Sequence, residues 1–136
     1  MIPRPGAPLL GLAALALLAV ACGDASASTQ ATVAIHYSHF TPDVITASAG
    51  EPITITLRND DPIEHEWIVG PPDVHERHRA GTEPFHNQVP TEVTIPALST
   101  RVTTLTFEQP GDYLYICHLP GHEAYGMVGT LRVVED

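Results

Sequence analysis

The feature that most constrains this chain is a stretch near its C-terminus, residues 111–129, which reads GDYLYICHLPGHEAYGMVG. It contains a thiol, an imidazole and a thioether at equal intervals, at Cys117, His122 and Met127. Soft sulfur ligands together with imidazole select copper, and two histidines and a cysteine in one plane, with a weak axial methionine, are typical of electron-transfer sites. The stretch therefore predicts a copper loop, and its second histidine must come from elsewhere in the chain.

The residues that flank these ligands predict a loop at the end of a β-strand. Tyr113, Tyr115 and Cys117 occupy alternate positions, as residues on one face of a half-buried strand do. Pro120 and Gly121 then turn the chain sharply, so that three side chains of the loop can point toward one place. We therefore expect a metal site at one end of a β-structure.

The rest of the chain predicts a single all-β domain. Its 136 residues suffice for one domain and are too few for two. The 13 prolines, the 10 glycines and the recurrent Val, Ile and Thr favour short strands and turns. Strands are expected over residues 33–40, 43–47, 52–58, 65–69, 91–95, 101–107, 111–117 and 128–134, with a long charged loop over 70–90. Seven or eight short strands predict a Greek-key β-sandwich or barrel.

Residues 1–21 predict an export signal. Arg4 precedes an apolar run, residues 9–20, which is too short to span a bilayer and ends in small residues. The segment AVACG that follows resembles a bacterial lipobox, which would make Cys22 the lipidated first residue of the mature protein. The alternative is ordinary cleavage after Ala21 or Ala27, which would give a soluble exported protein.

The expected domain organisation follows from this reading. Residues 22–31 are small and polar and predict a flexible linker, and the copper-binding domain is expected over residues 32–136. The expected location is the periplasm or the extracellular face of the cell membrane, with a lipid anchor at Cys22 in the first alternative.

The net charge limits which classes of partner the protein can bind. The net charge at pH 7 is −10 and all six basic residues are arginines, which disfavours a nucleic-acid partner and favours a partner with a basic patch.

The two cysteines are Cys22 and Cys117. A disulfide between them, or a buried inert thiol, is the alternative to metal binding. The flexible segment after Cys22 argues against the first, and the regular spacing of His122 and Met127 argues against the second.

The missing imidazole ligand is predicted to be His65. It follows the expected strand over 52–58 and a turn, and it opens the next strand, so it can lie at the end of the sandwich beside Cys117. His118 follows Cys117 directly and its side chain should point to the opposite side, so it is predicted to be a neighbour and not a ligand. His36 and His39 are expected to be surface or core imidazoles.

At these residues the chain resembles the cupredoxin family, the small type 1 copper proteins. Residues 117–129 are similar to the C-x-x-P-G-H-x-x-x-G-M-x-G loop of rusticyanin- and sulfocyanin-like members. Asn59, six residues before His65, resembles the family's pattern of a strand ending in Asn ahead of the first copper histidine. The resemblance covers residues 33–134. It implies a cupredoxin-like sandwich with one type 1 copper ion on His65, Cys117, His122 and Met127.

The resemblance and the ligand set imply a carrier of single electrons between redox partner proteins, such as a cytochrome or a terminal oxidase or reductase. The exposed edge of His122 is the expected electron portal, and no enzymatic activity is expected. A multicopper oxidase would have histidine where Ile116 stands and several H-x-H pairs, and this chain has none of these. A binuclear copper centre would need two bridging cysteines, and only Cys117 is available.

The alternative function is that of an exported copper carrier or chaperone. It would use His75, His78 and His86 as a second, looser site, and His75 and His78 are spaced to share a helical face. These histidines could equally lie on an exposed loop without binding a metal. A copper carrier should bind more than one equivalent and release Cu(I) readily, whereas an electron carrier should hold a single ion.

Overall fold

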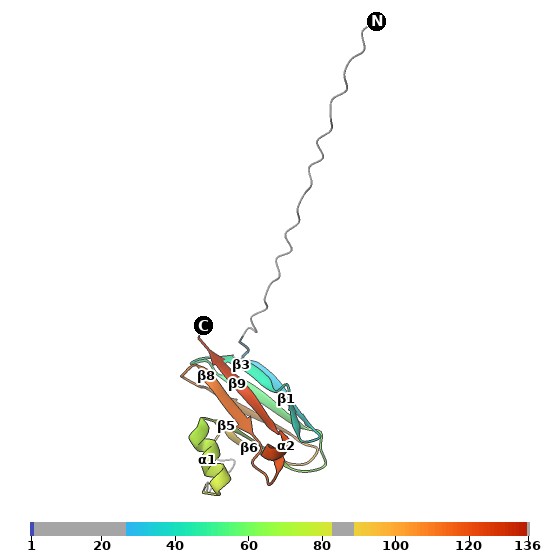
Figure 1. Ribbon diagram of the computed structural model, residues 1–136, viewed down its shortest axis with the longest axis vertical. Coiled ribbons are helices and arrows are strands. Elements are labelled where there is room, and N and C mark those ends of the chain that lie inside the picture. Colours follow the sequence, from blue (N-terminus) through green and yellow to red (C-terminus); the bar gives the residue numbers. More distant parts are fainter. Residues whose placement is uncertain (2–26, 83–88, 136) are drawn as a thin grey trace.

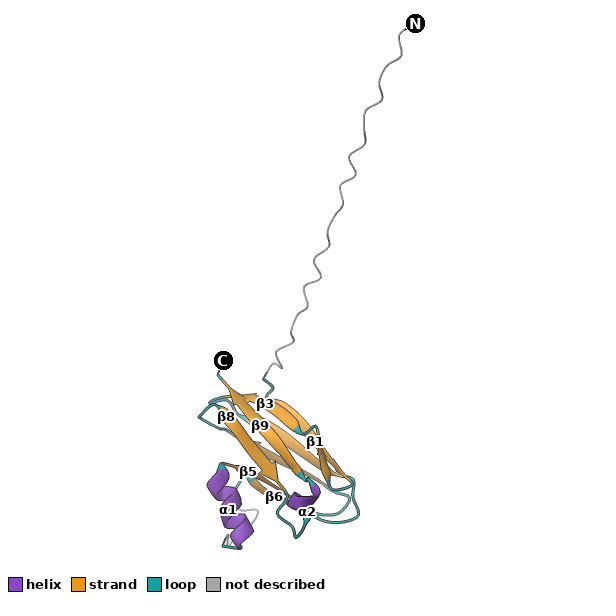
Figure 2. Ribbon diagram, in the orientation of Figure 1, coloured by secondary structure: helices purple, strands orange, loops and turns teal. Residues whose placement is uncertain are grey.

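The computed structural model describes residue 1 and residues 27–82 and 89–135. Two stacked β-sheets form a sandwich, and two helices lie toward one end of it (Figure 1, Figure 2). The strands are β1 (Gln30–His36), β2 (His39–Thr41), β3 (Val44–Ser48), β4 (Ile53–Asn59), β5 (His65–Gly70), β6 (Glu92–Ile95), β7 (Thr100–Leu105), β8 (Gly111–Ile116) and β9 (Val128–Val134). The helices are α1 (Pro72–Ala80) and α2 (His122–Tyr125). The export signal, Cys22 and His86 lie outside the described residues.

The two sheets confirm the predicted all-β sandwich. One sheet has the strand order β2-β1-β4-β7 and the other β3-β9-β8-β5-β6. Strand β1 runs parallel to β4 and β3 runs parallel to β9, whereas the other pairs of described strands are antiparallel. The chain passes repeatedly from one sheet to the other, so residues distant in sequence share one core.

The core is built from alternating apolar residues, as the sequence predicts for β4. Ile53, Ile55 and Leu57 are buried, and the threonines between them are half-buried. The largest fully buried side chains are Trp67 and Tyr115, whose rings lie 5.7 Å apart. Burial of each large apolar side chain contributes about 1.5–3 kcal/mol.

The N-terminal part of the domain differs from the predicted boundaries. Strand β1 begins at Gln30, so the last two residues of the predicted 22–31 linker pair with β4. The predicted strand over 33–40 is a hairpin, because Tyr37 and Ser38 adopt φ values of 52° and 55° and reverse the chain into β2. The carboxylate of Asp61, far away in the sequence, accepts hydrogen bonds from both turn N–H groups. This distant acceptor is what local sequence patterns could not reveal.

The predicted loop over 70–90 contains helix α1, which the prediction missed. The helix begins with Pro72 at its first turn, where proline costs no hydrogen bond, and ends at Gly81, whose φ is 67°. Asp73 near its start and Arg79 near its end match the helix dipole. Among the described residues, no helix is long and apolar enough to cross a membrane.

Candidate metal centre

Three separate elements bring the predicted ligands to one end of the sandwich. Strands β5 and β8 are antiparallel neighbours, so the start of β5 and the end of β8 lie at the same end of their sheet. His65 is the first residue of β5, and Cys117 directly follows β8. His122 is the first residue of α2, and Met127 lies between α2 and β9.

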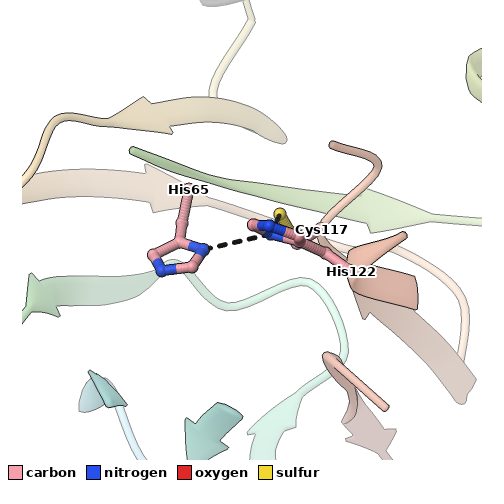
Figure 3. A group of neighbouring side chains, drawn as sticks. All are labelled: His65, Cys117 and His122. Atoms are coloured by element: carbon pink, nitrogen blue, oxygen red, sulfur yellow. Dashed lines mark hydrogen bonds between the residues drawn. The ribbon is translucent and has the colours of Figure 1, made fainter. Parts of the chain in front are cut away.

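The side chains of His65, Cys117 and His122 converge (Figure 3). One ligand atom from each lies within 4.8 Å of the others. Nδ1 of His65 lies 3.3 Å from Nδ1 of His122, which in turn lies 3.2 Å from Sγ of Cys117. His65 and Cys117 are completely buried, whereas His122 is partly exposed. The start of β5 and the copper loop, which carry the predicted ligands, therefore lie side by side.

The backbone of the copper loop holds Met127 beside the other ligands. Helix α2 is a single turn framed by Gly121 and Gly126, with φ values of 85° and 105°, which glycine adopts without strain. The N–H of Met127 donates to the carbonyl of His122 at 3.0 Å, and the N–H of Cys117 donates to the carbonyl of Met127 at 3.2 Å. The Met127 side chain is completely buried in the core cluster that also contains Cys117.

The Cys117 thiol is prepared to bind a metal ion rather than to react with solvent. Burial raises the pKa of the Cys117 thiol, and N–H groups of Glu66 and Leu119 directed at the sulfur partly offset this. The N–H of Glu66 lies 3.3 Å from the sulfur. A metal ion bound here would displace the thiol proton, and the two N–H groups would stabilise the resulting thiolate.

Asp61 orients His65 and is the functional residue that the sequence analysis missed. Its carboxylate lies 2.9 Å from Nε2 of His65. Burial opposes ionisation of Asp61, but hydrogen bonds from the N–H groups of Ser38 and Tyr37, and from His65, hold its pKa below the ordinary value. Burial lowers the pKa of His65, which is therefore neutral at pH 7. Nε2–H of His65 thus donates to Asp61, and the Nδ1 electron pair faces Cys117 and His122.

The donor set fits copper. Two imidazoles, a thiol that a metal can deprotonate and a buried thioether are the ligands that type 1 copper uses. The other described histidines are not part of this group. His36 and His39 are exposed, His75 and His78 lie on α1, and His118 faces away from the site toward α1.

Comparison with known proteins agrees with this geometry. The profile of the family described as Cupredoxin-like domain matches residues 10–131 of the chain. The chain belongs to the cupredoxin family. His65, Cys117, His122 and Met127 form its type 1 copper site.

One relative and several solved structures resemble this cupredoxin. The copper-resistant cuproprotein CopI of Rubrivivax gelatinosus is 30% identical over 117 residues, covering 82% of this chain and 70% of that protein. Reduced auracyanin from Roseiflexus castenholzii matches with a TM-score of 0.68 at 22% identity, covering 80% of this chain and 99% of its own. Auracyanin A from Chloroflexus aurantiacus, described as a blue copper protein, has a TM-score of 0.60 at 24% identity and covers 77% and 98%. At these identities the auracyanins establish the likeness of fold.

Proposed function

We propose that this cupredoxin carries single electrons between redox partner proteins. Bound copper would supply the one-electron couple between Cu(I) and Cu(II). The observation that supports the proposal is the burial of the ligands, because His65, Cys117 and Met127 are completely inaccessible to solvent. A site of this kind holds its metal and leaves no room for a substrate, so we infer no enzymatic activity.

His122 is the proposed route for electrons, because it is the ligand that reaches the surface. Its imidazole is partly exposed, and Pro120, Ala124 and Tyr125 beside it in the loop are exposed. A partner that docks on these residues would approach the metal through one ring. The net charge of −10 favours a partner with a basic docking surface, such as a cytochrome or a terminal oxidase or reductase.

We further infer that the protein works outside the cytoplasmic membrane. The support is the pattern of residues 1–21 and the lipobox-like segment before Cys22. A lipid on Cys22 would hold the domain at the periplasmic or extracellular face of that membrane. We also propose that the copper loop is of the type found in rusticyanin- and sulfocyanin-like members; the support is the spacing of residues 117–129.

Copper handling is the second candidate function. It is favoured by the 30% identity to a protein named for copper resistance, CopI. A carrier that delivers copper would need a site from which the ion leaves readily. The burial of His65 and Cys117 argues against rapid release from the type 1 site.

One experiment separates the two functions. The copper-loaded protein is reduced and mixed, in separate stopped-flow runs, with an oxidised cytochrome and with a Cu(I)-specific chelator. An electron carrier should oxidise within the mixing experiment and lose copper to the chelator only over hours. Faster loss of Cu(I) to the chelator than of the electron to the cytochrome would favour the carrier of copper.

A further inference from the structure

Three histidines form a second cluster on the opposite side of the β8 end from the copper site. This histidine cluster consists of His75 and His78 on α1 and His118 in the copper loop. Nδ1 of His75 lies 2.9 Å from Nε2 of His118, and the ring of His78 stacks on that of His118 with centroids 5.2 Å apart. His75 is 2% exposed, and the side chains of His78 and His118 are 1% and 5% exposed.

The ring nitrogens directed away from the centre of the cluster face acceptors. Nε2 of His75 lies 3.1 Å from the carbonyl of Leu114. Nδ1 of His118 lies 3.6 Å from a carboxylate oxygen of Glu123. Histidines that bind metals are oriented in this way, with one nitrogen directed to a carbonyl or carboxylate and the other left for the ion.

The proton positions in the cluster leave one mismatch. Nε2 of His75 faces an acceptor, so it carries the proton and Nδ1 carries the electron pair. Nε2 of His118 must then donate to His75, which leaves the electron pair of His118 Nδ1 facing the Glu123 carboxylate. A cation between His75 and His118 removes the mismatch, because His118 can then carry its proton on Nδ1.

We propose that Nδ1 of His75 and Nε2 of His118 bind a second metal ion of the copper or zinc class. Imidazole is a ligand that suits both metals. His78 fixes the plane of His118 by stacking, and the carboxylates of Glu92 and Glu123 add negative charge at the edge of the cluster. Arg79 pairs with Glu123 and offsets part of that charge.

The dimensions of the cluster suit an ion. Two imidazole nitrogens bound to one tetrahedral ion at about 2.05 Å lie about 3.3 Å apart. The pair here is separated by 2.9 Å, so the ion requires a shift of a few tenths of an ångström. The copper site shows similarly short ligand separations of 3.3 Å and 3.2 Å. Because Cys117 and His118 are consecutive, the second ion would be joined to the first by a single peptide unit.

The test is a Zn²⁺ titration of the purified protein whose type 1 site is already filled with Cu²⁺. The absorption band of the first site reports that copper stays in place and that the domain is folded. Competition with a chromophoric chelator should show one further equivalent of Zn²⁺. His75→Gln and His118→Gln should each weaken this binding at least about tenfold. A parallel titration with Cu²⁺, followed by electron paramagnetic resonance, should show a second copper signal without thiolate character.

Control variants keep the proposal falsifiable. His39→Gln removes an exposed imidazole that stacks on Tyr125 of the copper loop, and His36→Gln removes another exposed imidazole of the domain. Both should bind the second Zn²⁺ as the wild type does. The proposal fails if there is no second equivalent, if His75→Gln binds it unchanged, or if a control variant loses it equally. Should His118→Gln not fold, His75→Gln alone decides, since it lies outside the sandwich. A second equivalent is also what a copper carrier should bind, so the stopped-flow comparison above, and not this titration, decides whether the first site carries electrons.

Discussion

The two side chains of the Cys117–His118 dipeptide enter two different environments. The sulfur of Cys117 points into the core between the sheets and meets His65 and His122. The imidazole of His118 points to α1 and meets His75. Sulfur and imidazole together select copper in the first site, whereas the histidine cluster has imidazoles alone and is chemically less selective.

The two sites also differ in the elements that hold their ligands in place. The first is fixed by strands of the sandwich, by the buried carboxylate of Asp61 and by backbone hydrogen bonds of the loop. The second depends on one helix that packs on the sheet from outside. The helix is oriented by the contact of His75 with the carbonyl of Leu114, by the stacked histidine rings and by the ion pair between Arg79 and Glu123. A metal should therefore be held firmly in the first site and exchange more easily in the second.

The largest expected difference is between the variants His65→Gln and His75→Gln. His65→Gln removes a buried ligand, so the protein should lose its colour and its copper affinity should fall by more than about 100-fold. His75→Gln leaves the four copper ligands intact and should keep the intense absorption. The copper content after dialysis measures copper binding by each variant, and the visible spectrum measures the intense absorption. Equal loss of colour in the two variants would show that the sites are not separate.

Asp61→Asn should have the next largest effect. It removes the negative charge beside His65, so Cu(II) affinity should fall by about 10- to 100-fold and the reduction potential should rise. Redox potentiometry and copper competition measure these changes, and His36→Gln, an exposed neighbour of the same carboxylate, is the control. An unchanged potential would contradict the assigned role.

The same variant gives a pH dependence in the metal-free protein. Because folding holds the pKa of Asp61 below its ordinary value of 3.8, the carboxylate stabilises the fold fully above that pH. This contribution is lost as the pH falls through the lower pKa of the folded state. The stability difference between wild type and Asp61→Asn in urea unfolding should therefore shrink below pH 3.8. A stability difference that stays constant below that pH would contradict the lowered pKa of Asp61 in the folded state.

Met127→Leu should have a smaller effect. The two side chains have similar volumes, so the buried exchange should cost less than about 1.5 kcal/mol of unfolding free energy. Loss of the weak thioether ligand should raise the reduction potential while the intense absorption remains. Potentiometry and the spectrum test this together. A lowered potential would contradict an axial role for Met127.

Arg79→Ala should have the smallest effect. The ion pair with Glu123 joins α1 to the copper loop, but the two side chains are 46% and 33% exposed. Its loss should cost no more than about 1 kcal/mol, and less at high salt. Thermal unfolding at two salt concentrations measures this. A loss of several kcal/mol would mean that α1 is integral to the first site as well.

Much of the first site was predictable, because its ligands form a contiguous motif. The spacing of Cys117, His122 and Met127 predicted three of the copper ligands. The position of His65 at the start of a strand predicted the fourth. Asp61 could not be predicted, because the sequence around it reads as a turn. Only the fold shows that its carboxylate meets both the β1–β2 turn and His65.

The second site was less predictable for a related reason. The direction of His118, away from the copper site, followed from its place next to Cys117. Its partner did not, because the prediction gave residues 70–90 as a loop. Pro72, Asp73 and Gly81 are start and stop signals of a helix that could have been recognised. That this helix packs its histidines against the copper loop is a tertiary property that local signals do not contain.

The central claim is that a copper ion binds to a thiolate and imidazoles in this fold. The visible absorption spectrum of the copper-loaded, oxidised protein tests it most directly, with Cys117→Ala as the control. The wild type should show an intense band near about 600 nm from the Cu(II)–thiolate bond, and Cys117→Ala should not. A colourless wild type at one copper per chain, or an equally intense band in Cys117→Ala, would contradict the account.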